Sequence, residues 1–295
     1  MRRDSFLPYF QPSIDEEEIQ EVVNTLKSGW LTTGPRVEKF EQLLVEYTGA
    51  KYAVAVNSCT AALHLSLVAL GVGKGDEVIT TPLTFAATAN VIVHAGAKPV
   101  FADICLDTYN IDPEEVKKVI TSKTKAIIPV HYAGQPCDIK ALKKIAEDQN
   151  LYIVEDAAHA LGAEYFHKKI GTFGHSTCFS FYATKNITTA EGGAVTTDIK
   201  ELAETLQVLR LHGIDKDAWK RYSSEGRWYY ELKECGFKEN MTDIQAALGI
   251  CQMKKLDKFI EIRRKYAQIY TRELGSLNGV ITPCEKPKVK HPYHI

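Results

Sequence analysis

Lys185 stands in a sequence setting that could turn its side-chain amine into a nucleophile. It follows the apolar residues 179–181 and precedes a stretch of mostly small residues, 186–193, that allows close backbone approach. A buried lysine loses its charge more easily than an exposed one, and a nucleophilic amine must be uncharged. The alternative is that Lys185 is one of many solvated lysines.

Three residues at the start of a predicted helix could bind an anion. Ser58, Cys59 and Thr60 follow a predicted strand over 52–56 and open a helix over 60–70. Free N–H groups and the helix dipole at such a point suit a phosphate. Taken alone, Ser58 and Thr60 at a helix start more often act only as helix caps.

Four further side chains that could take part in binding or catalysis follow predicted strands. Phe85, His131 and Asp156 each come after a strand, and His159 lies one helical turn beyond Asp156. Each has an ordinary structural interpretation: Phe85 as core, Asp156 as a helix cap or surface acid, and the histidines as hydrogen-bonded structural residues. Their shared position after strands makes them candidates for one site.

Strands and helices alternate along the chain, which is typical of an α/β fold with a mainly parallel sheet covered on both faces. We predict strands over 52–56, 77–80, 99–102, 125–130, 151–154, 176–181 and 193–197. In such a sheet, ligands bind beyond the carboxyl ends of the strands. The candidate residues should therefore gather at one edge of the sheet.

This combination of groups fits one cofactor, pyridoxal 5′-phosphate (PLP). Its aldehyde needs a lysine amine, its pyridine nitrogen a carboxylate, its phosphate a helix N-terminus with hydroxyl groups, and its ring a flat apolar face. Lys185, Asp156, residues 58–60 and Phe85 could supply these four groups. The convergence of the set carries the prediction, because each residue alone is a weak signal.

Capping patterns predict helices near the N-terminus and after the last strand. Ser13 begins a Ser-x-x-Glu capping box before a helix with one apolar face, formed by Ile19, Val22, Val23 and Leu26. Asp198 begins a second pattern of this kind. A long helical pattern over 242–274 is expected to leave the sheet domain.

We expect two domains of unequal size. The large PLP-binding α/β domain with an N-terminal arm should cover residues 1–250. Residues 251–295 should hold the long helix and the start of a small C-terminal domain, which we expect to be incomplete. The last five residues resemble the entry to a strand.

The composition is that of a globular protein and excludes several classes of function. The chain has 295 residues and a net charge of −1, so no global field attracts nucleic acid or an anionic membrane. Apolar runs fall far short of the roughly 20 residues that span a bilayer, and no signal stretch follows the N-terminus. Seven scattered cysteines without a Cys-x-x-Cys pair favour a cytoplasmic protein with neither disulfides nor a metal site.

Three segments resemble the signature sequences of the DegT/StrS-type nucleotide-sugar aminotransferases. They are residues 57–65, with the sequence NSCTAALHL, residues 155–160, with EDAAHA, and residues 180–193, with SFYATKNITTAEGG. Residues 28–35 and 236–243 fit the same family, so the resemblance runs in order over essentially the whole chain. The third segment is the most specific of the set.

The resemblance implies the architecture of fold-type I PLP enzymes, with an aspartate-aminotransferase-like large domain and a smaller C-terminal one. It implies that Lys185 carries the cofactor as a Schiff base and that Asp156 pairs with the pyridine nitrogen. Phe85 would stack on the ring, and His159 would lie beside its 3-hydroxyl group.

The resemblance also assigns the residues around the phosphate. Cys59, Thr60 and Ser180 would hold it, with Ser58 beside them in the cofactor site. Asn240 would reach the phosphate of the neighbouring subunit's cofactor, because enzymes of this kind are homodimers with shared active sites.

The implied activity is transfer of the amino group of L-glutamate to a nucleotide-linked keto-sugar, in amino-sugar or cell-surface polysaccharide biosynthesis. The sequence over 185–193 resembles members that act at sugar C4 more than those that act at C3. Two alternatives are a PLP-dependent sugar dehydratase, which carries histidine in place of Lys185, and a regulatory protein that binds PLP without turnover. A nicotinamide oxidoreductase and a P-loop NTPase are excluded, because neither glycine-rich pattern occurs.

Overall fold

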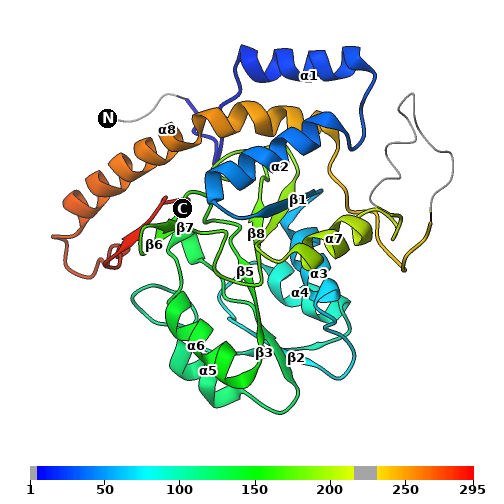
Figure 1. Cartoon of the computed structure of the whole chain (residues 1–295). Helices are drawn as coiled ribbons and strands as arrows, with labels where there is room; N and C mark the ends of the chain where they lie inside the picture. The colour runs from blue at the N-terminus through cyan, green and yellow to red at the C-terminus, as the bar shows by residue number, and fades with distance from the viewer. Residues whose placement is uncertain (1–4, 216–230) are drawn as a thin grey trace.

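The computed structural model describes residues 5–215 and 231–295, and its centre is a seven-stranded sheet (Figure 1). The strands lie in the order β1-β9-β8-β5-β4-β2-β3. Their bounds are β1 (Tyr52–Val56), β2 (Glu77–Thr80), β3 (Lys98–Phe101), β4 (Thr124–Ile127), β5 (Tyr152–Asp156), β8 (Ser176–Ser180) and β9 (Gly193–Thr197). Every pairing is parallel except those of β9, which runs antiparallel to both neighbours. The prediction of a mainly parallel sheet is confirmed.

Helices cover both faces of the sheet and enclose a hydrophobic core on each (Figure 1). Side chains along β1 alternate between the two cores, with Ala53 and Ala55 in one and Val54 and Val56 in the other. The first core contains residues from α2 (Pro35–Thr48), α5 (Pro113–Val119), α6 (Ile139–Gln149) and α8 (Asp243–Leu274). The second contains residues from α3 (Cys59–Ala69), α4 (Ala86–His94) and α7 (Lys200–Leu209).

Helix α1 (Glu16–Ser28) differs from its prediction in its cap and in the face that it buries. Its N-cap is Asp15, not Ser13, and the capping box is formed two residues further along. The side chains of Ile19 and Leu26, at two positions of the apolar face, are 50% and 52% exposed. The predicted cap is therefore wrong, and the apolar positions do not mark the face that the helix buries.

The buried face of α1 is polar because α8 offers it polar partners. Glu18 is fully buried and accepts hydrogen bonds from the Lys255 ammonium at 2.6 Å and the Gln252 amide at 2.7 Å. A carboxylate can be buried when an opposite charge and donors surround it in this way. Apolar periodicity cannot reveal such a face, because its partners are more than 200 residues away in the sequence.

A second capping prediction is also wrong. The Asp198 carboxylate accepts a hydrogen bond from the Lys51 N–H at 2.9 Å, and α7 has no side-chain cap. The side chain therefore joins the start of β1 to the end of β9 instead of starting the helix. This use of an aspartate is invisible in a local capping pattern.

The C-terminal segment returns to the sheet domain after α8. Its strand β10 (Val289–Lys290) joins β6 (Glu164–Tyr165) and β7 (Lys168–Lys169) in a small sheet that the sequence analysis missed. The His294 N–H donates to the Ala133 carbonyl at 3.0 Å, which fixes the last residues beside the sheet. The predicted domain division at residue 250 falls within α8 and stays a prediction.

Two absences hold for residues 5–215 and 231–295. None of their helices has the length and apolar character needed to cross a membrane. Nor do three or more histidine, cysteine, aspartate or glutamate side chains in these ranges gather in a way that could hold a metal ion.

Two histidines of the C-terminal segment predict that stability falls in mild acid. Burial lowers the pKa of His291 from 6.5 to about 4 and that of His294 to about 2. Below pH 6.5 the unfolded chain therefore binds protons that the folded chain does not. The free energy of unfolding should decrease from pH 6.5 to 4 by up to about 1.4 kcal/mol per pH unit for each histidine.

Urea denaturation at a series of pH values measures this decrease. The variant His294→Gln removes one of these two histidines, so its stability should fall less steeply over the same range. A slope equal to that of the native chain would contradict the assignment.

Candidate active site

One large cavity opens at the carboxyl ends of the central strands, where the sequence predicts a ligand. Its volume is about 850 Å³. Asn240 does not line it; the side-chain amide of this residue donates to the Thr33 hydroxyl at 2.7 Å, near the end of β1. The other eight predicted site residues all line the cavity: Ser58, Cys59, Thr60, Phe85, Asp156, His159, Ser180 and Lys185.

Asp156 is a buried carboxylate with hydrogen bonds but no ion pair among the described residues. Its two oxygens accept from the Thr88 hydroxyl at 2.8 Å and from the Ala158 N–H at 3.2 Å. Burial raises the pKa of Asp156, and these two hydrogen bonds oppose the rise. The sequence analysis missed Thr88, because its position inside α4 gave no sign that it faces a carboxylate on β5.

A second buried acid, Glu155, holds the strand end beneath the cavity. One oxygen contacts His131 Nε2 at 2.9 Å, and the other accepts from the Gly174 N–H and the Thr177 hydroxyl, both at 2.7 Å. The Cys137 N–H donates to His131 Nδ1, so the proton of the neutral ring lies on Nε2 and points at Glu155. His131 does not line the cavity, and its role here is structural.

The N-terminus of α3 presents backbone donors to the cavity. The Ser58 hydroxyl caps the helix by accepting from the Ala61 N–H at 3.1 Å. The N–H groups of Cys59 and Thr60 have no acceptor among the described residues, and both residues line the cavity. Burial raises the pKa of the Cys59 thiol, which therefore stays uncharged and leaves the positive helix end uncompensated.

Glycine at position 193 allows β9 to approach this helix end. A Cβ atom there would lie 2.4 Å from the Ser58 carbonyl carbon and 2.5 Å from the Cys59 nitrogen, closer than any side chain tolerates. Gly193 pairs with Ser180 across the sheet, so the same contact brings the Ser180 hydroxyl beside the helix N-terminus. The glycine that begins β9 thus allows close packing at the site.

Lys185 lies in a loop that is fixed at both ends. The Phe181 N–H donates to the Gly192 carbonyl, and the Thr189 N–H donates back to the Phe181 carbonyl, both at 2.9 Å. Burial lowers the pKa of Lys185, against the opposing influence of Cys59 and Asp156. The lysine is therefore held in the cavity wall with its amine biased toward the uncharged form that a nucleophile or base requires.

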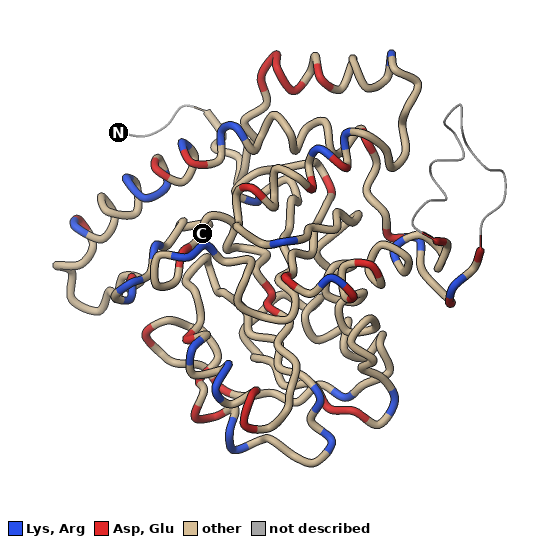
Figure 2. Tube along the Cα trace, viewed as in Figure 1, with Lys and Arg blue, Asp and Glu red and all other residues tan. Residues whose placement is uncertain are grey.

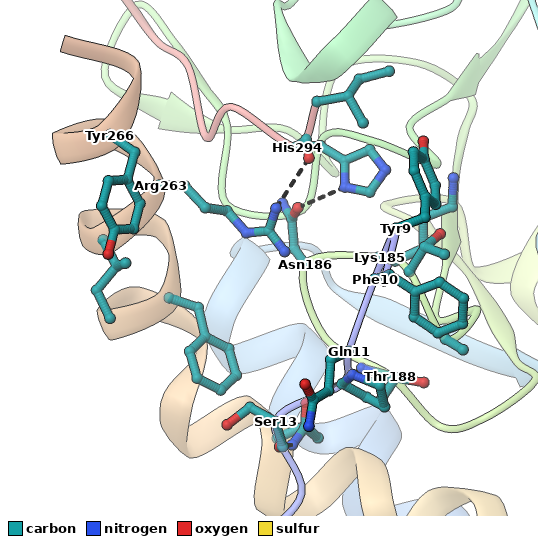
Figure 3. A pocket seen from close by; sticks show the side chains of 17 residues that line it. Tyr9, Phe10, Gln11, Ser13, Lys185, Asn186, Thr188, Arg263, Tyr266 and His294 are labelled. Carbon is teal, nitrogen blue, oxygen red and sulfur yellow. Dashed lines mark hydrogen bonds between the residues drawn. The ribbon is translucent and has the colours of Figure 1, made fainter. Parts of the chain in front are cut away.

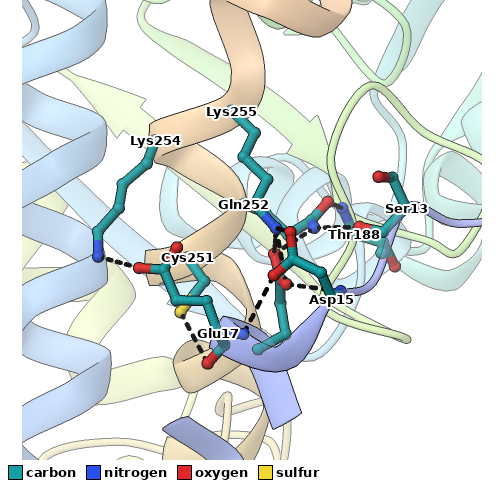
Figure 4. A network of polar contacts seen from close by, with 9 residues as sticks. Ser13, Asp15, Glu17, Thr188, Cys251, Gln252, Lys254 and Lys255 are labelled. Carbon is teal, nitrogen blue, oxygen red and sulfur yellow. Dashed lines mark hydrogen bonds and ion pairs between the residues drawn. The ribbon is translucent and has the colours of Figure 1, made fainter. Parts of the chain in front are cut away.

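The N-terminal arm reaches the same cavity and is held there by α8 (Figure 4). The Gln252 amide donates to the Ser13 carbonyl at 2.8 Å, and its oxygen accepts from the Thr188 N–H at 3.4 Å. One side chain thus joins the arm to the lysine loop. Tyr9 and Phe10 of the arm line the cavity, which the sequence analysis did not predict.

His159 lies against His294, with ring centroids 4.4 Å apart. Burial and the nearby Lys185 charge lower the pKa of His159 to about 3, so the ring is neutral at ordinary pH. Its Nδ1 is buried and has no hydrogen-bond partner in the described part of the chain. Such an atom calls for a polar ligand group, because buried polar atoms rarely remain unpaired.

The chemistry of these groups fits PLP. A phosphate would accept from the free N–H groups of α3, a protonated ring nitrogen would pair with Asp156, and the 3-hydroxyl group would lie by His159 Nδ1. The Phe85 side chain is 80% exposed and offers a flat apolar face at the cavity. The donors, the acid and the amine thus match the parts of one cofactor.

Comparison with known proteins identifies the family. A model of the DegT/DnrJ/EryC1/StrS aminotransferase family matches residues 12–295. An uncharacterized protein from Methanocaldococcus jannaschii, MJ1066, is 63% identical over 295 residues, which cover 100% of this chain and 76% of that protein. The spore coat polysaccharide biosynthesis protein SpsC of Bacillus subtilis is 52% identical over 294 residues, which cover 100% of this chain and 76% of SpsC.

Solved structures agree with this result. Spr1654 of Streptococcus pneumoniae, provisionally assigned as a sugar aminotransferase, has been solved in a pyridoxamine-phosphate form and a PLP form. The first is 38% identical with a TM-score of 0.92, over 98% of this chain and 77% of that chain. The second is 37% identical with a TM-score of 0.88, over 98% and 76%. The chain therefore belongs to the DegT/DnrJ/EryC1/StrS aminotransferase family and is a PLP-dependent sugar aminotransferase.

Proposed function

We propose that this enzyme transfers the amino group of L-glutamate to carbon 4 of a nucleotide-linked keto-sugar. The observation that carries the proposal is the meeting of Lys185, Asp156 and the α3 N-terminus around one cavity. PLP, when bound, supplies an electron sink that stabilises a carbanion next to the transferred nitrogen. The similarity to SpsC, a polysaccharide biosynthesis protein, supports a place in the formation of surface sugars.

The residues around the cavity have distinct roles in this proposal. The Asp156 carboxylate would hold a proton on the pyridine nitrogen, and its two hydrogen bonds favour its ionised form against the burial that raises its pKa. The N–H groups of Cys59 and Thr60, with the Ser180 hydroxyl, bind the phosphate. Phe85 covers one face of the ring, and His159 lies at the 3-hydroxyl group.

Lys185 has two tasks, first as the point of attachment and then as the base. With PLP bound, Lys185 would hold the cofactor, and its freed Nζ would be the base in the same cavity for the carbon that must lose a proton. An uncharged amine can accept that proton and return it one position along, and burial favours the uncharged form. The same Nζ serves the donor and the sugar, because the second half of the reaction reverses the first.

Replacement of Lys185 tests this role. Lys185→Ala and Lys185→Arg should both abolish turnover, and PLP added to either variant should lack the visible absorbance of the lysine-bound cofactor. Lys144→Ala is a matched control, because Lys144 is an exposed lysine that pairs with Asp148 four residues along its helix. Transamination retained by a Lys185 variant would refute the role.

The choice of sugar position requires a substrate panel. Nucleotide-linked 4-keto and 3-keto sugars, each incubated with glutamate and the PLP-loaded enzyme, should give an aminated product only with the 4-keto compounds. Mass spectrometry of the products measures this directly. Amination of the 3-keto sugars alone would overturn the assignment to carbon 4 and leave the aminotransferase activity intact.

We also propose that the enzyme is a homodimer in which Asn240 completes the neighbouring subunit's site. This residue does not line the cavity of its own chain, although its segment lies beside the end of β1. The side chain is buried and already fixed by its contact with Thr33, so a partner's cofactor would meet a rigid amide.

Co-expression of two inactive variants tests the shared site. Chains carrying Lys185→Ala and chains carrying Asn240→Ala should assemble at random, and half of the dimers would then contain one intact site. About a quarter of the native activity should return. Lys185→Ala with Asp156→Asn is the matched control and should restore nothing, because both changes then affect sites of their own chains. Equal recovery in both mixtures would contradict the proposal.

A further inference from the structure

A second cavity adjoins the first at Lys185 (Figure 3). Its volume is about 450 Å³, and it lies between the N-terminal arm, the lysine loop, α8 and the C-terminal segment. Both cavities are lined by Tyr9, Phe10, Thr184, Lys185 and His294. A molecule that reacts at Lys185 and is too long for the first cavity can therefore extend into the second.

The guanidinium group of Arg263, a residue of α8, lines this second cavity. Figure 3 shows its side chain reaching from the helix toward Asn186 and His294. Its guanidinium donates to the His294 carbonyl at 3.0 Å and forms no ion pair with any described residue. No aspartate or glutamate of residues 5–215 and 231–295 lines the cavity.

The next residue, Arg264, shows how an arginine of this helix is neutralised when its role is structural. Its guanidinium donates to both oxygens of Glu285, at 2.6 and 3.2 Å, and to the His291 carbonyl at 2.6 Å. Arg263 pairs with no acid among the described residues and is only partly exposed to water. Its burial lowers the pKa of the guanidinium. A partly buried guanidinium with most of its five donors unused is unfavourable unless an anion binds to it.

The His294 side chain lines the second cavity together with Lys185 and Arg263, and it is fixed there by a hydrogen bond. Its Nδ1 contacts the Asn186 Oδ1 at 3.2 Å, while the Asn186 amide donates to the Leu161 carbonyl at 2.9 Å. The ring is neutral, because burial together with Lys185 and Arg263 keeps its pKa near 2.

We propose that Arg263 is a substrate-binding residue that takes anionic oxygens, either a carboxylate of the amino donor or the diphosphate of the nucleotide sugar. The proposal rests on the function proposed above, in which both substrates react at Lys185. Arginine suits this task because its planar fork of donors matches carboxylate and phosphate oxygens. Tyr9 and Tyr266 add aromatic surface to the wall of the cavity.

Calorimetric binding to the cofactor-free protein separates the two sources. Glutarate represents the carboxylates of the donor, and a nucleoside diphosphate represents the second substrate. Arg263→Gln should weaken binding of one of them by about 10-fold or more, because a charge-assisted hydrogen bond is lost. The probe that is weakened identifies the bound group. If both probes bind as tightly as to the native chain, the proposal is overturned.

Two further variants guard against a loss of folding. Arg264→Gln lies on the same helix, removes a structural ion pair and should leave both binding constants unchanged. Arg263→Lys keeps the charge and should recover part of the lost affinity. A thermal melt of each variant shows whether it is folded, and equal weakening by Arg264→Gln would also overturn the proposal.

Steady-state kinetics of the PLP-loaded enzyme provide an independent measurement. Arg263→Gln should raise the KM of the substrate whose probe is weakened, by about 10-fold or more, with a smaller change in kcat. Glutamate should still change the visible absorbance of the bound cofactor at saturating concentration. If Arg263→Gln keeps the native KM values and glutamate still changes the absorbance, the role of Arg263 is rejected and the proposed function stands. If glutamate causes no absorbance change in the native enzyme, the proposed function itself is rejected.

Discussion

The burial of the Asp156 carboxylate, which forms no ion pair with any residue that the structure describes, is the constraint on which the rest of the site depends. A charged group in a protein interior must be compensated, and here two hydrogen bonds favour the ionised acid without supplying a positive charge. Its field favours a positive charge on whatever ring nitrogen meets it. Lys185 lies in the same cavity but is itself biased toward the uncharged amine. The unmatched acid therefore remains available for a ligand.

One reversed strand in an otherwise parallel sheet brings the other parts of the site together. Because β9 runs antiparallel between β8 and β1, the chain turns back after Ser180 and forms the lysine loop above the sheet edge. The strand then enters beside α3 at Gly193, where no side chain fits. The turn that exposes Lys185 and the close approach that presents the α3 donors are thus two results of one topology.

The parts of this arrangement that sequence could predict are those encoded by short segments. Strand ends followed by Ser58, Asp156 and Lys185 predicted the sheet edge and the cofactor, because position after a strand fixes position in a parallel sheet. Thr88 and the arm were missed, since their contacts join segments far apart in the chain. The polar face that α1 buries was missed for the same reason. Long-range polar partners change which side of a helix is buried and leave no periodic signal.

These long-range contacts also explain how the arm can belong to the active site. Gln252 is buried and binds the Ser13 carbonyl and the backbone of the lysine loop (Figure 4). It also donates to the Glu18 carboxylate. A change in the arm therefore acts on the loop through one shared side chain, without a hinge or a further element. Arg263 lies about three turns further along the same helix, so α8 positions both the loop and the cation beside it. Geometry at Lys185 is thus fixed from one side by the sheet and from the other by this helix.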